Sequence, residues 1–255
     1  MARRILVTGG TGFLGYRVIR ALADEGAAVT VLGAPGVEDR LGILRNRIQW
    51  ATADVWSPST LRGRARGQQM VIHLVGGLQP DLKRGLTFRH LNAVSARNVT
   101  QMAVSDAVPH FILLSAAGRL SGLPGGYIES KREAEAYLRK SGLNWTIVRA
   151  PPLYAPGQRR NPFYQLLTGL SWLPLFGAAF TPVAPLSVDI AARGIARLAL
   201  DEVLASNRLL MPGRLRQLGR LPIFDSDGEA AAVVPLETSD SDSFDNVPFG
   251  WLPPP

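Results

Sequence analysis

Two side chains that together could move a proton stand four residues apart in the segment GGYIESKREAEAYL. They are Tyr127 and Lys131. On a helix this spacing places both side chains on one face. A nearby ammonium favours the phenolate, so we expect Lys131 to lower the pKa of Tyr127 toward working pH. Such a tyrosine exchanges a proton with an alcohol or carbonyl oxygen while a nicotinamide exchanges hydride. The pair alone is common, so its meaning depends on the elements that position it.

A glycine pattern near the start of the chain, VTGGTGFLG, supplies that context. Gly9, Gly12 and Gly15 follow a short apolar stretch and open a helical pattern, which is where a dinucleotide-binding loop stands. The first glycine permits the tight turn, the second lets backbone approach a pyrophosphate, and the third lets helix and strand pack closely. The helix N-terminus then faces the phosphates. We predict a dinucleotide site; the alternative is a tight strand-to-helix turn without a ligand.

Strand and helix patterns alternate along the chain, which favours a parallel sheet covered by helices. We predict strands at 4–7, 28–32, 48–51, 70–75, 110–115 and 144–148, and helices at 13–24, 86–107 and 127–141. The fold class is α/β, a doubly wound parallel sheet of the Rossmann type. We assign residues 1–155 to the dinucleotide-binding domain and 156–224 to a small substrate cap that completes the fold. Residues 225–255 form an acidic, Pro-rich tail that we expect to be flexible or loosely docked.

The choice between NAD and NADP depends on the end of the second predicted strand. An acid there would favour the free ribose diol of NAD, but the sequence reads Val31-Leu32-Gly33-Ala34. We therefore expect NAD(P), with a slight preference for NADP. Three arginines are candidates to bind its 2′-phosphate: Arg3, Arg17 and Arg40.

Together these motifs resemble the short-chain dehydrogenase/reductase superfamily over roughly residues 3–200. The resemblance is closest to the extended and atypical branches, which are epimerase/dehydratase-like. The matching stretches are VTGGTGFLG, ADVWSPSTL, VIHLVGG, HLNAVSARNVTQMA, FILLSAAG, YIESKREAE, WTIVRAPPLY and PLSVDIAARGIARLAL. The resemblance implies a set of cofactor-binding residues: Gly9, Thr11, Gly12, Phe13, Leu14, Gly15, Asp54, Val55, Val75, Gly76, Lys131, Pro151 and Leu153. Within it, Asp54 and Val55 flank the adenine, and Val75 and Gly76 lie along the ribose.

The same resemblance implies a catalytic tetrad. Tyr127 matches the acid/base, Lys131 the ribose-binding residue and Asn92 the helix asparagine. Ser115 fits the Ser-x-x-Gly form, in which the serine orients the substrate oxygen. Many extended members use the next position instead, which is Ala116 here. A third interpretation is that Ser115 is a strand-end hydroxyl bonded to backbone.

Two functions follow from this reading of the sequence. The first is an NAD(P)-dependent oxidoreductase or epimerase/dehydratase-like enzyme acting on a small, apolar carbonyl or alcohol. The second is a non-catalytic nucleotide-holding scaffold, assembly factor or redox-sensing regulator, similar to the Rossmann-type accessory subunit of respiratory complex I. Such relatives often lack the Tyr-x-x-x-Lys pair, so its presence favours the enzyme.

The substrate side is represented by residues 161–182, which carry aromatic residues and leucines and no charge. This segment predicts either a pocket for an apolar substrate or packing against helices or a second subunit. Arg159 and Arg160, just before it, are candidates to bind an acidic group or stand on a solvated loop.

Composition narrows the function classes. The sequence has no cysteine, which excludes disulfides and thiolate metal sites, and its three histidines are too scattered for a metal site.

Residues 1–224 hold 28 Lys and Arg and 13 acids, whereas residues 225–255 hold seven acids and no Lys or Arg. We expect a solvated basic surface rather than nucleic-acid binding. The tail's Phe244, Phe249 and Trp251 are candidates to anchor it to this body or to a protein partner. No leader or membrane span is evident, so we expect a cytoplasmic protein. A homodimer is compatible with the sequence.

Overall fold

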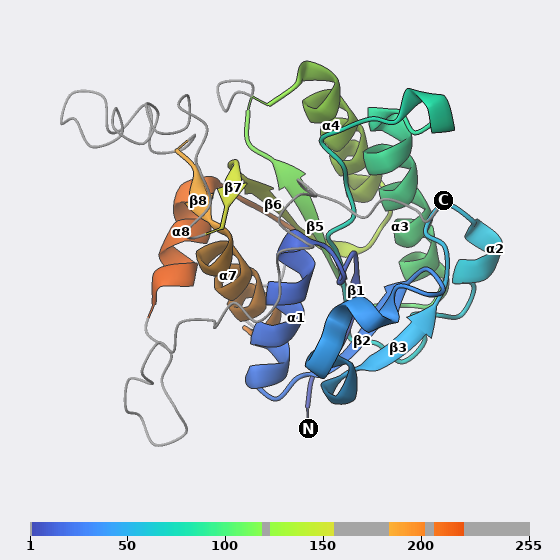
Figure 1. Cartoon of the computed structure of the whole chain (residues 1–255), viewed down its shortest axis with the longest axis vertical. Coiled ribbons are helices and arrows are strands. Elements are labelled where there is room, and N and C mark those ends of the chain that lie inside the picture. The colour runs from blue at the N-terminus through green and yellow to red at the C-terminus, as the bar shows by residue number, and fades with distance from the viewer. Residues whose placement is uncertain (1, 119–122, 156–183, 202–206, 222–255) are drawn as a thin grey trace.

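The computed structural model describes residues 2–118, 123–155, 184–201 and 207–221 (Figure 1). The segment 161–182, Arg159 and Arg160, and the tail at 225–255 therefore lie outside the described residues. Of the predicted cap, the described parts form two helices, one edge strand of the main sheet and one strand of a separate two-stranded sheet.

One parallel sheet forms the centre of the molecule and confirms the predicted α/β class (Figure 1). Its order is β3-β2-β1-β4-β5-β6-β9, and all its pairs are parallel. The strand order reverses between β1 and β4, and such sheets bind ligands outside the carboxyl ends of the strands at that point. The strands are β1 (Arg4–Thr8), β2 (Ala28–Gly33), β3 (Gln49–Thr52), β4 (Met70–His73), β5 (His110–Ala116), β6 (Asn144–Ala150) and β9 (Arg208–Leu210). A separate two-stranded sheet joins β7 (Leu153–Tyr154) to β8 (Leu186–Ser187).

Helices cover both faces of the sheet, which explains why its central strands are apolar on both sides (Figure 1). On one face lie α1 (Phe13–Asp24), α7 (Val188–Leu200) and α8 (Pro212–Arg220). On the other lie α2 (Pro58–Leu61), α3 (Ser95–Ser105) and α4 (Gly125–Arg139). Successive strand residues supply different cores: Ile5 and Val7 pack toward α1 and α7, and Leu6 packs toward α3.

Three further helices lie in the connections between the main elements. The structure differs from the sequence prediction in one helix and two strands. The connections contain the 3₁₀ helices η1 (Glu38–Arg47) and η2 (Leu82–Arg84) and the π-helix η3 (His90–Val94). The helix predicted at 86–107 is therefore η3 followed by α3, and the strand predicted at 70–75 ends at His73. β9 was not predicted, because its three residues carry no alternation that could be read from sequence.

Candidate functional site

The glycine loop after β1 has the backbone that the sequence pattern predicts. Gly9 has φ +79°, a left-handed conformation that favours glycine, and the amide of Gly12 donates to the carbonyl of Gly9 at 3.1 Å. A Cβ on Gly15 would collide with the same carbonyl oxygen, so only glycine lets α1 begin this close to β1. Gly12 is the N-cap of α1 and provides no side-chain cap, which leaves the first helical N–H groups to face an anion.

Two small cavities lie on either side of this loop. One is lined by Gly9, Gly12, Phe13, Leu14, Gly15, Leu74, Gly76, Leu114, Tyr127 and Lys131, and the other by Gly9, Thr11, Leu32, Gly33, Ala34, Ala53, Val55 and Val75. The structure thus brings ten of the predicted cofactor-binding residues together at the switch point of the sheet. Asp54, Pro151 and Leu153 line neither cavity. The Asp54 carboxylate instead accepts from the backbone N–H of Trp56 at 2.9 Å.

Tyr127 and Lys131 lie together on α4, as their spacing predicts. Both are buried, and Lys131 Nζ lies 5.8 Å from the centre of the Tyr127 ring. The ammonium nitrogen donates to the carbonyls of Val75 and Leu114, both at 3.2 Å. Lys131 thereby ties α4 to the ends of β4 and β5 and fixes the position of Tyr127 beside the glycine loop.

The pKa values of this pair differ from the sequence expectation. Burial raises the pKa of Tyr127, and the lowering effect of Arg132 is smaller. Burial also lowers the pKa of Lys131 to about 7, against a smaller raising effect of Glu135. The predicted lowering of the Tyr127 pKa was therefore wrong: loss of water around the phenol outweighs the neighbouring cations.

Asn92 and Gly76 complete this side of the site. Asn92 is buried within η3, where Oδ1 accepts from the N–H of Gly77 at 3.1 Å and Nδ2 donates to the carbonyl of Phe88 at 2.9 Å. A Cβ on Gly76 would stand 2.5 Å from both Asn92 Oδ1 and Lys131 Nζ. The side chains of Asn92 and Lys131 thus converge on the backbone of Gly76. Short π-helical segments such as η3 are frequent at functional sites.

Ser115 is not brought to Tyr127. Its hydroxyl donates to Glu135 Oε1 at 2.6 Å and accepts from Arg132 Nη1 at 3.1 Å. The β5 side chain that packs against Tyr127 is Ala116. Of the three interpretations of Ser115, its placement fits a structural hydroxyl, although its partner is a carboxylate rather than backbone.

Sequence reasoning missed the cluster around Glu135. This carboxylate has no exposed surface and binds Arg132 at 2.6 Å, Arg139 at 3.1 Å and Arg149 at 2.6 Å. Burial acts to raise the pKa of Glu135, but hydrogen bonds from Arg149 and Ser115 and the charge of Arg132 hold it below its usual value. The i−3 and i+4 spacing of Arg132 and Arg139 was visible in the sequence, but such spacing usually marks a solvated helix face.

The cavity lined by Ala34, Ala53, Val55 and Val75, where the resemblance places the adenine, is mainly apolar. The Trp50 ring covers Gly33 at the end of β2, where a Cβ would stand 2.5 Å from Trp50 Cη2. Two of the three candidate arginines are placed elsewhere. Arg17 pairs with Asp189 at 3.1 Å and donates to the carbonyl of Phe13, and Arg3 precedes β1 at the amino end of the sheet. Arg40 is exposed on η1, the segment that follows β2.

The described residues contain neither a candidate metal site nor a helix suited to cross a membrane. Ranges 2–118, 123–155, 184–201 and 207–221 hold no group of three or more His, Cys, Asp or Glu side chains that could hold a metal ion. Within the same ranges, no helix combines the length and apolar character that crossing a membrane requires.

A parallel sheet with a glycine loop at its switch point, facing a buried Tyr–Lys pair, defines a dinucleotide-binding Rossmann protein. The chain belongs to the NAD(P)H-binding family, whose model matches residues 9–167.

Similar proteins agree with this assignment. Ceramide reductase of Caulobacter vibrioides is 29% identical over 206 residues, covering 78% of this chain and 62% of that protein. The decarboxylating sterol-4-alpha-carboxylate 3-dehydrogenase of Bos taurus is 29% identical over 194 residues, covering 76% and 52%. The chain thus spans between half and two thirds of these curated relatives. Among solved structures, a dTDP-glucose 4,6-dehydratase from Streptomyces venezuelae with NAD bound is 25% identical, with a TM-score of 0.59 over 81% of this chain and 74% of the other.

Proposed function

We propose that the chain is an NAD(P)-dependent oxidoreductase or epimerase-like enzyme that acts on a small, apolar carbonyl or alcohol, with Tyr127 as the acid/base. One observation carries this proposal. The cavity lined by Gly9, Gly12 and Gly76 is also lined by Tyr127 and Lys131, so the dinucleotide loop and a proton-transferring group share one space. A holder of nucleotide has no need for a buried phenol at this position.

The chemistry divides between the cofactor and the chain. A bound nicotinamide supplies or accepts a hydride at the substrate carbon. In the reducing direction, Tyr127 Oη donates a proton to the carbonyl oxygen, and an alcohol forms. The raised pKa of Tyr127 keeps the phenol protonated at neutral pH, which is the form that donates. Lys131, held by the carbonyls of Val75 and Leu114, positions the ribose and stabilises the phenolate left behind.

The surroundings of Tyr127 support an apolar substrate. The phenol packs with Ala116 and Ile128, and the Phe88 ring lies edge-on to it at 6.3 Å between centroids. Leu78 and Leu123 pack against the same cluster. With Ala116 in place of a hydroxyl residue, β5 offers the reacting oxygen no side-chain donor at this position. Two relatives at 29% identity are named for lipid substrates, a ceramide and a sterol, which favours the same class.

The test uses Tyr127→Phe with Tyr137→Phe as the matched control, because Tyr137 stands on the same helix and faces away, toward a groove beside α3. Each variant is assayed for dinucleotide binding and for NADPH or NADH oxidation with a panel of long-chain and steroid ketones. Tyr127→Phe should keep its affinity for the dinucleotide and lose about 10²- to 10⁴-fold in turnover. Unchanged turnover in Tyr127→Phe would refute the mechanism.

A second candidate is a nucleotide-holding scaffold or redox-sensing regulator. The observation that favours it is Ala116, which leaves the tetrad without its serine beside Tyr127. In this case the dinucleotide would stabilise the protein against unfolding, no carbonyl in the panel would be reduced, and capture of a protein partner would depend on which redox form of the dinucleotide is bound.

A further inference from the structure

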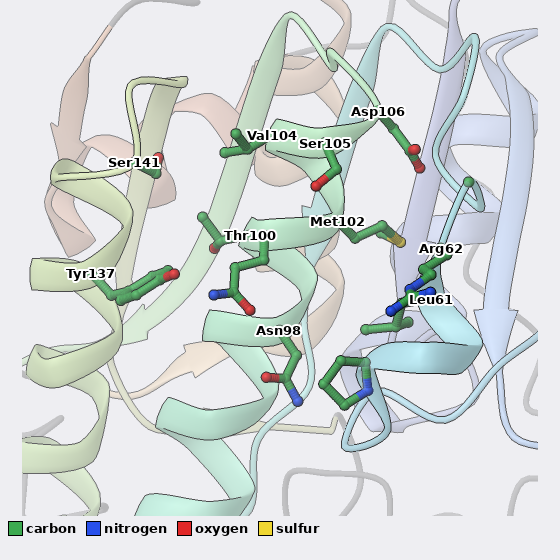
Figure 2. Close-up of a pocket in the computed structure, with 13 residues that line it drawn as sticks. Leu61, Arg62, Asn98, Thr100, Met102, Val104, Ser105, Asp106, Tyr137 and Ser141 are labelled. Carbon is green, nitrogen blue, oxygen red and sulfur yellow. The ribbon is translucent and has the colours of Figure 1, made fainter.

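A groove of about 430 Å³ lies between α2, α3 and α4, on the face of the sheet opposite to α1, α7 and α8 (Figure 2). It shares no lining residue with the two cavities at the glycine loop. Its lining includes Leu61, Arg62, Asn98, Met102, Asp106 and Tyr137. The dinucleotide site therefore does not account for this groove.

The groove contains a buried polar atom that lacks a partner. Asn98 is 3% exposed, and its Nδ2 donates to the carbonyl of Val55 at 3.1 Å. Its Oδ1 is buried and accepts no hydrogen bond from the described part of the chain. Leaving such an acceptor unpaired costs about 1–3 kcal/mol. Because Oδ1 is itself buried, an occupant of the groove reaches it only if the Asn98 side chain turns outward, so the rim of the groove must select the occupant.

The rim of the groove combines an apolar side chain with basic ones. Val104 lines it and is 46% exposed. Arg62 also lines it and is exposed. The side chain of Arg66 is 81% exposed and pairs with the carboxylate of the lining residue Asp106 at 3.7 Å. Lys140, exposed, directly precedes the lining residue Ser141. An occupant that carries acids together with large apolar groups complements this rim.

This chain contains a segment of that chemistry. Residues 240–251, DSDSFDNVPFGW, carry Asp240, Asp242 and Asp245, the aromatic residues Phe244, Phe249 and Trp251, and no Lys or Arg. The described body ends at Leu221, after α8. Trp251 stands 30 residues later, a reach of roughly 100 Å when extended. A body of this size has a radius of gyration of roughly 17 Å, so the path around its surface from one face to the other is roughly 70 Å.

We propose that residues 240–251 dock in the groove between α2, α3 and α4 of the same chain. The aspartates lie against Arg62, Arg66 and Lys140, and an aromatic side chain fills the hollow beside Val104.

The test exploits the lack of cysteine in the chain. The double variant Ser105→Cys/Ser243→Cys places one thiol on the groove lining and one in the docking segment. At low protein concentration and mild oxidation, it should form a disulfide within one chain at least tenfold faster than the control Gln217→Cys/Ser243→Cys, whose first thiol stands on α8. Adding Arg62→Glu and Lys140→Glu should slow the groove disulfide at least fivefold, and adding Arg214→Glu, on α8, should not.

Three results would overturn the proposal. Equal rates for the two cysteine pairs would mean that the tail only collides with the body. Disulfide-linked dimers, in place of bridged monomers, would mean that the groove receives the tail of a second copy. Rates unaffected by Arg62→Glu and Lys140→Glu would remove the basic rim from the interaction.

Discussion

The hydroxyl of Ser115 donates a 2.6 Å hydrogen bond to Oε1 of Glu135, a carboxylate with no exposed surface. Because Ser115 has one proton to donate, this bond removes it from any substrate oxygen on the other side of the strand. Arg132 links the same cluster to the end of β5, since its Nη2 donates to the carbonyl of Ala116 at 2.9 Å. Ser115 and Glu135 therefore support the position of the strand that carries Ala116 to Tyr127.

Replacing Ser115 by alanine should affect stability and not the cofactor site. We expect the free energy of unfolding to fall by about 1.5–3 kcal/mol, the range for a hydrogen bond to a charged group. The affinity for the dinucleotide should stay within about twofold, a factor worth well under 1 kcal/mol. Urea unfolding measures the free energy of unfolding, and fluorescence titration measures the affinity for the dinucleotide. The control is Ser141→Ala, whose hydroxyl donates to a neutral carbonyl. A Ser115→Ala variant with full stability and no turnover would restore Ser115 as a catalytic residue.

Replacing Glu135 by glutamine should be more harmful. The change leaves Arg132, Arg139 and Arg149 close together without the carboxylate that neutralises them, and breaking a buried ion pair costs about 3–5 kcal/mol. Glu133→Gln is the matched control on the same helix. Its pair with Arg89 is exposed, so the loss there should stay below about 1 kcal/mol. Equal losses in urea unfolding would show that the buried cluster contributes nothing special.

The sequence predicted the sheet and the glycine loop because both depend on local signals. Apolar runs of strand length and the Gly9–Gly15 spacing determine backbone geometry within one strand–helix unit. Tyr127 and Lys131 shared a helix face for the same reason. β9 and the break between η3 and α3 were missed because their conformations depend on distant contacts, such as the pairing of β9 with β6 and the bonds of Asn92 to Gly77.

The candidate site was harder to predict where the role of a residue depends on which of two sequence neighbours contacts the site. Ser115 and Ala116 are neighbours in sequence, and only the packing in the structure shows that Ala116 is the one beside Tyr127. The pKa of Tyr127 depends on burial, which spacing alone does not reveal. Likewise, Arg17 was a plausible phosphate ligand until the structure placed Asp189, 172 residues away, against it.

We expect a slight preference for NADP because the end of β2 has no acid, and Arg40 is the candidate arginine that the structure leaves exposed near β2, so its removal should change cofactor choice. We expect Arg40→Ala to weaken NADP binding about three- to tenfold, as loss of one exposed charge-assisted contact would, and to leave NAD binding unchanged. Arg45→Ala, also exposed on η1, serves as the control. Calorimetric titration of both dinucleotides measures the ratio. If the wild-type chain binds NAD more tightly than NADP, the preference itself is wrong.

His73 should make the protein sensitive to acid. It is fully buried, its Nδ1 lies 2.7 Å from Thr8 Oγ1, and its pKa is lowered to about 3, first by burial and then by Lys131. Between pH 6.5 and 3 the unfolded chain binds a proton that the folded chain refuses, so stability falls as the pH falls. From pH 6.5 to 4.5, above the usual pKa values of carboxylates, proton uptake by His73 in the unfolded chain should lower the free energy of unfolding by about 2–3 kcal/mol.

The measurement is urea unfolding at several pH values for the wild type and His73→Asn. The variant should be less stable at pH 7 but should lose less stability on acidification, because asparagine takes up no proton. His110→Asn is the comparison. The pKa of His110 is lowered to about 4, mainly by burial, so between pH 6.5 and 4.5 that variant should remove nearly as much of the slope as His73→Asn, and the two should separate only below pH 4. If His73→Asn and the wild type lose the same stability between pH 6.5 and 4.5, the folded protein takes up a proton on His73 without cost. The lowered pKa of His73 would then be contradicted.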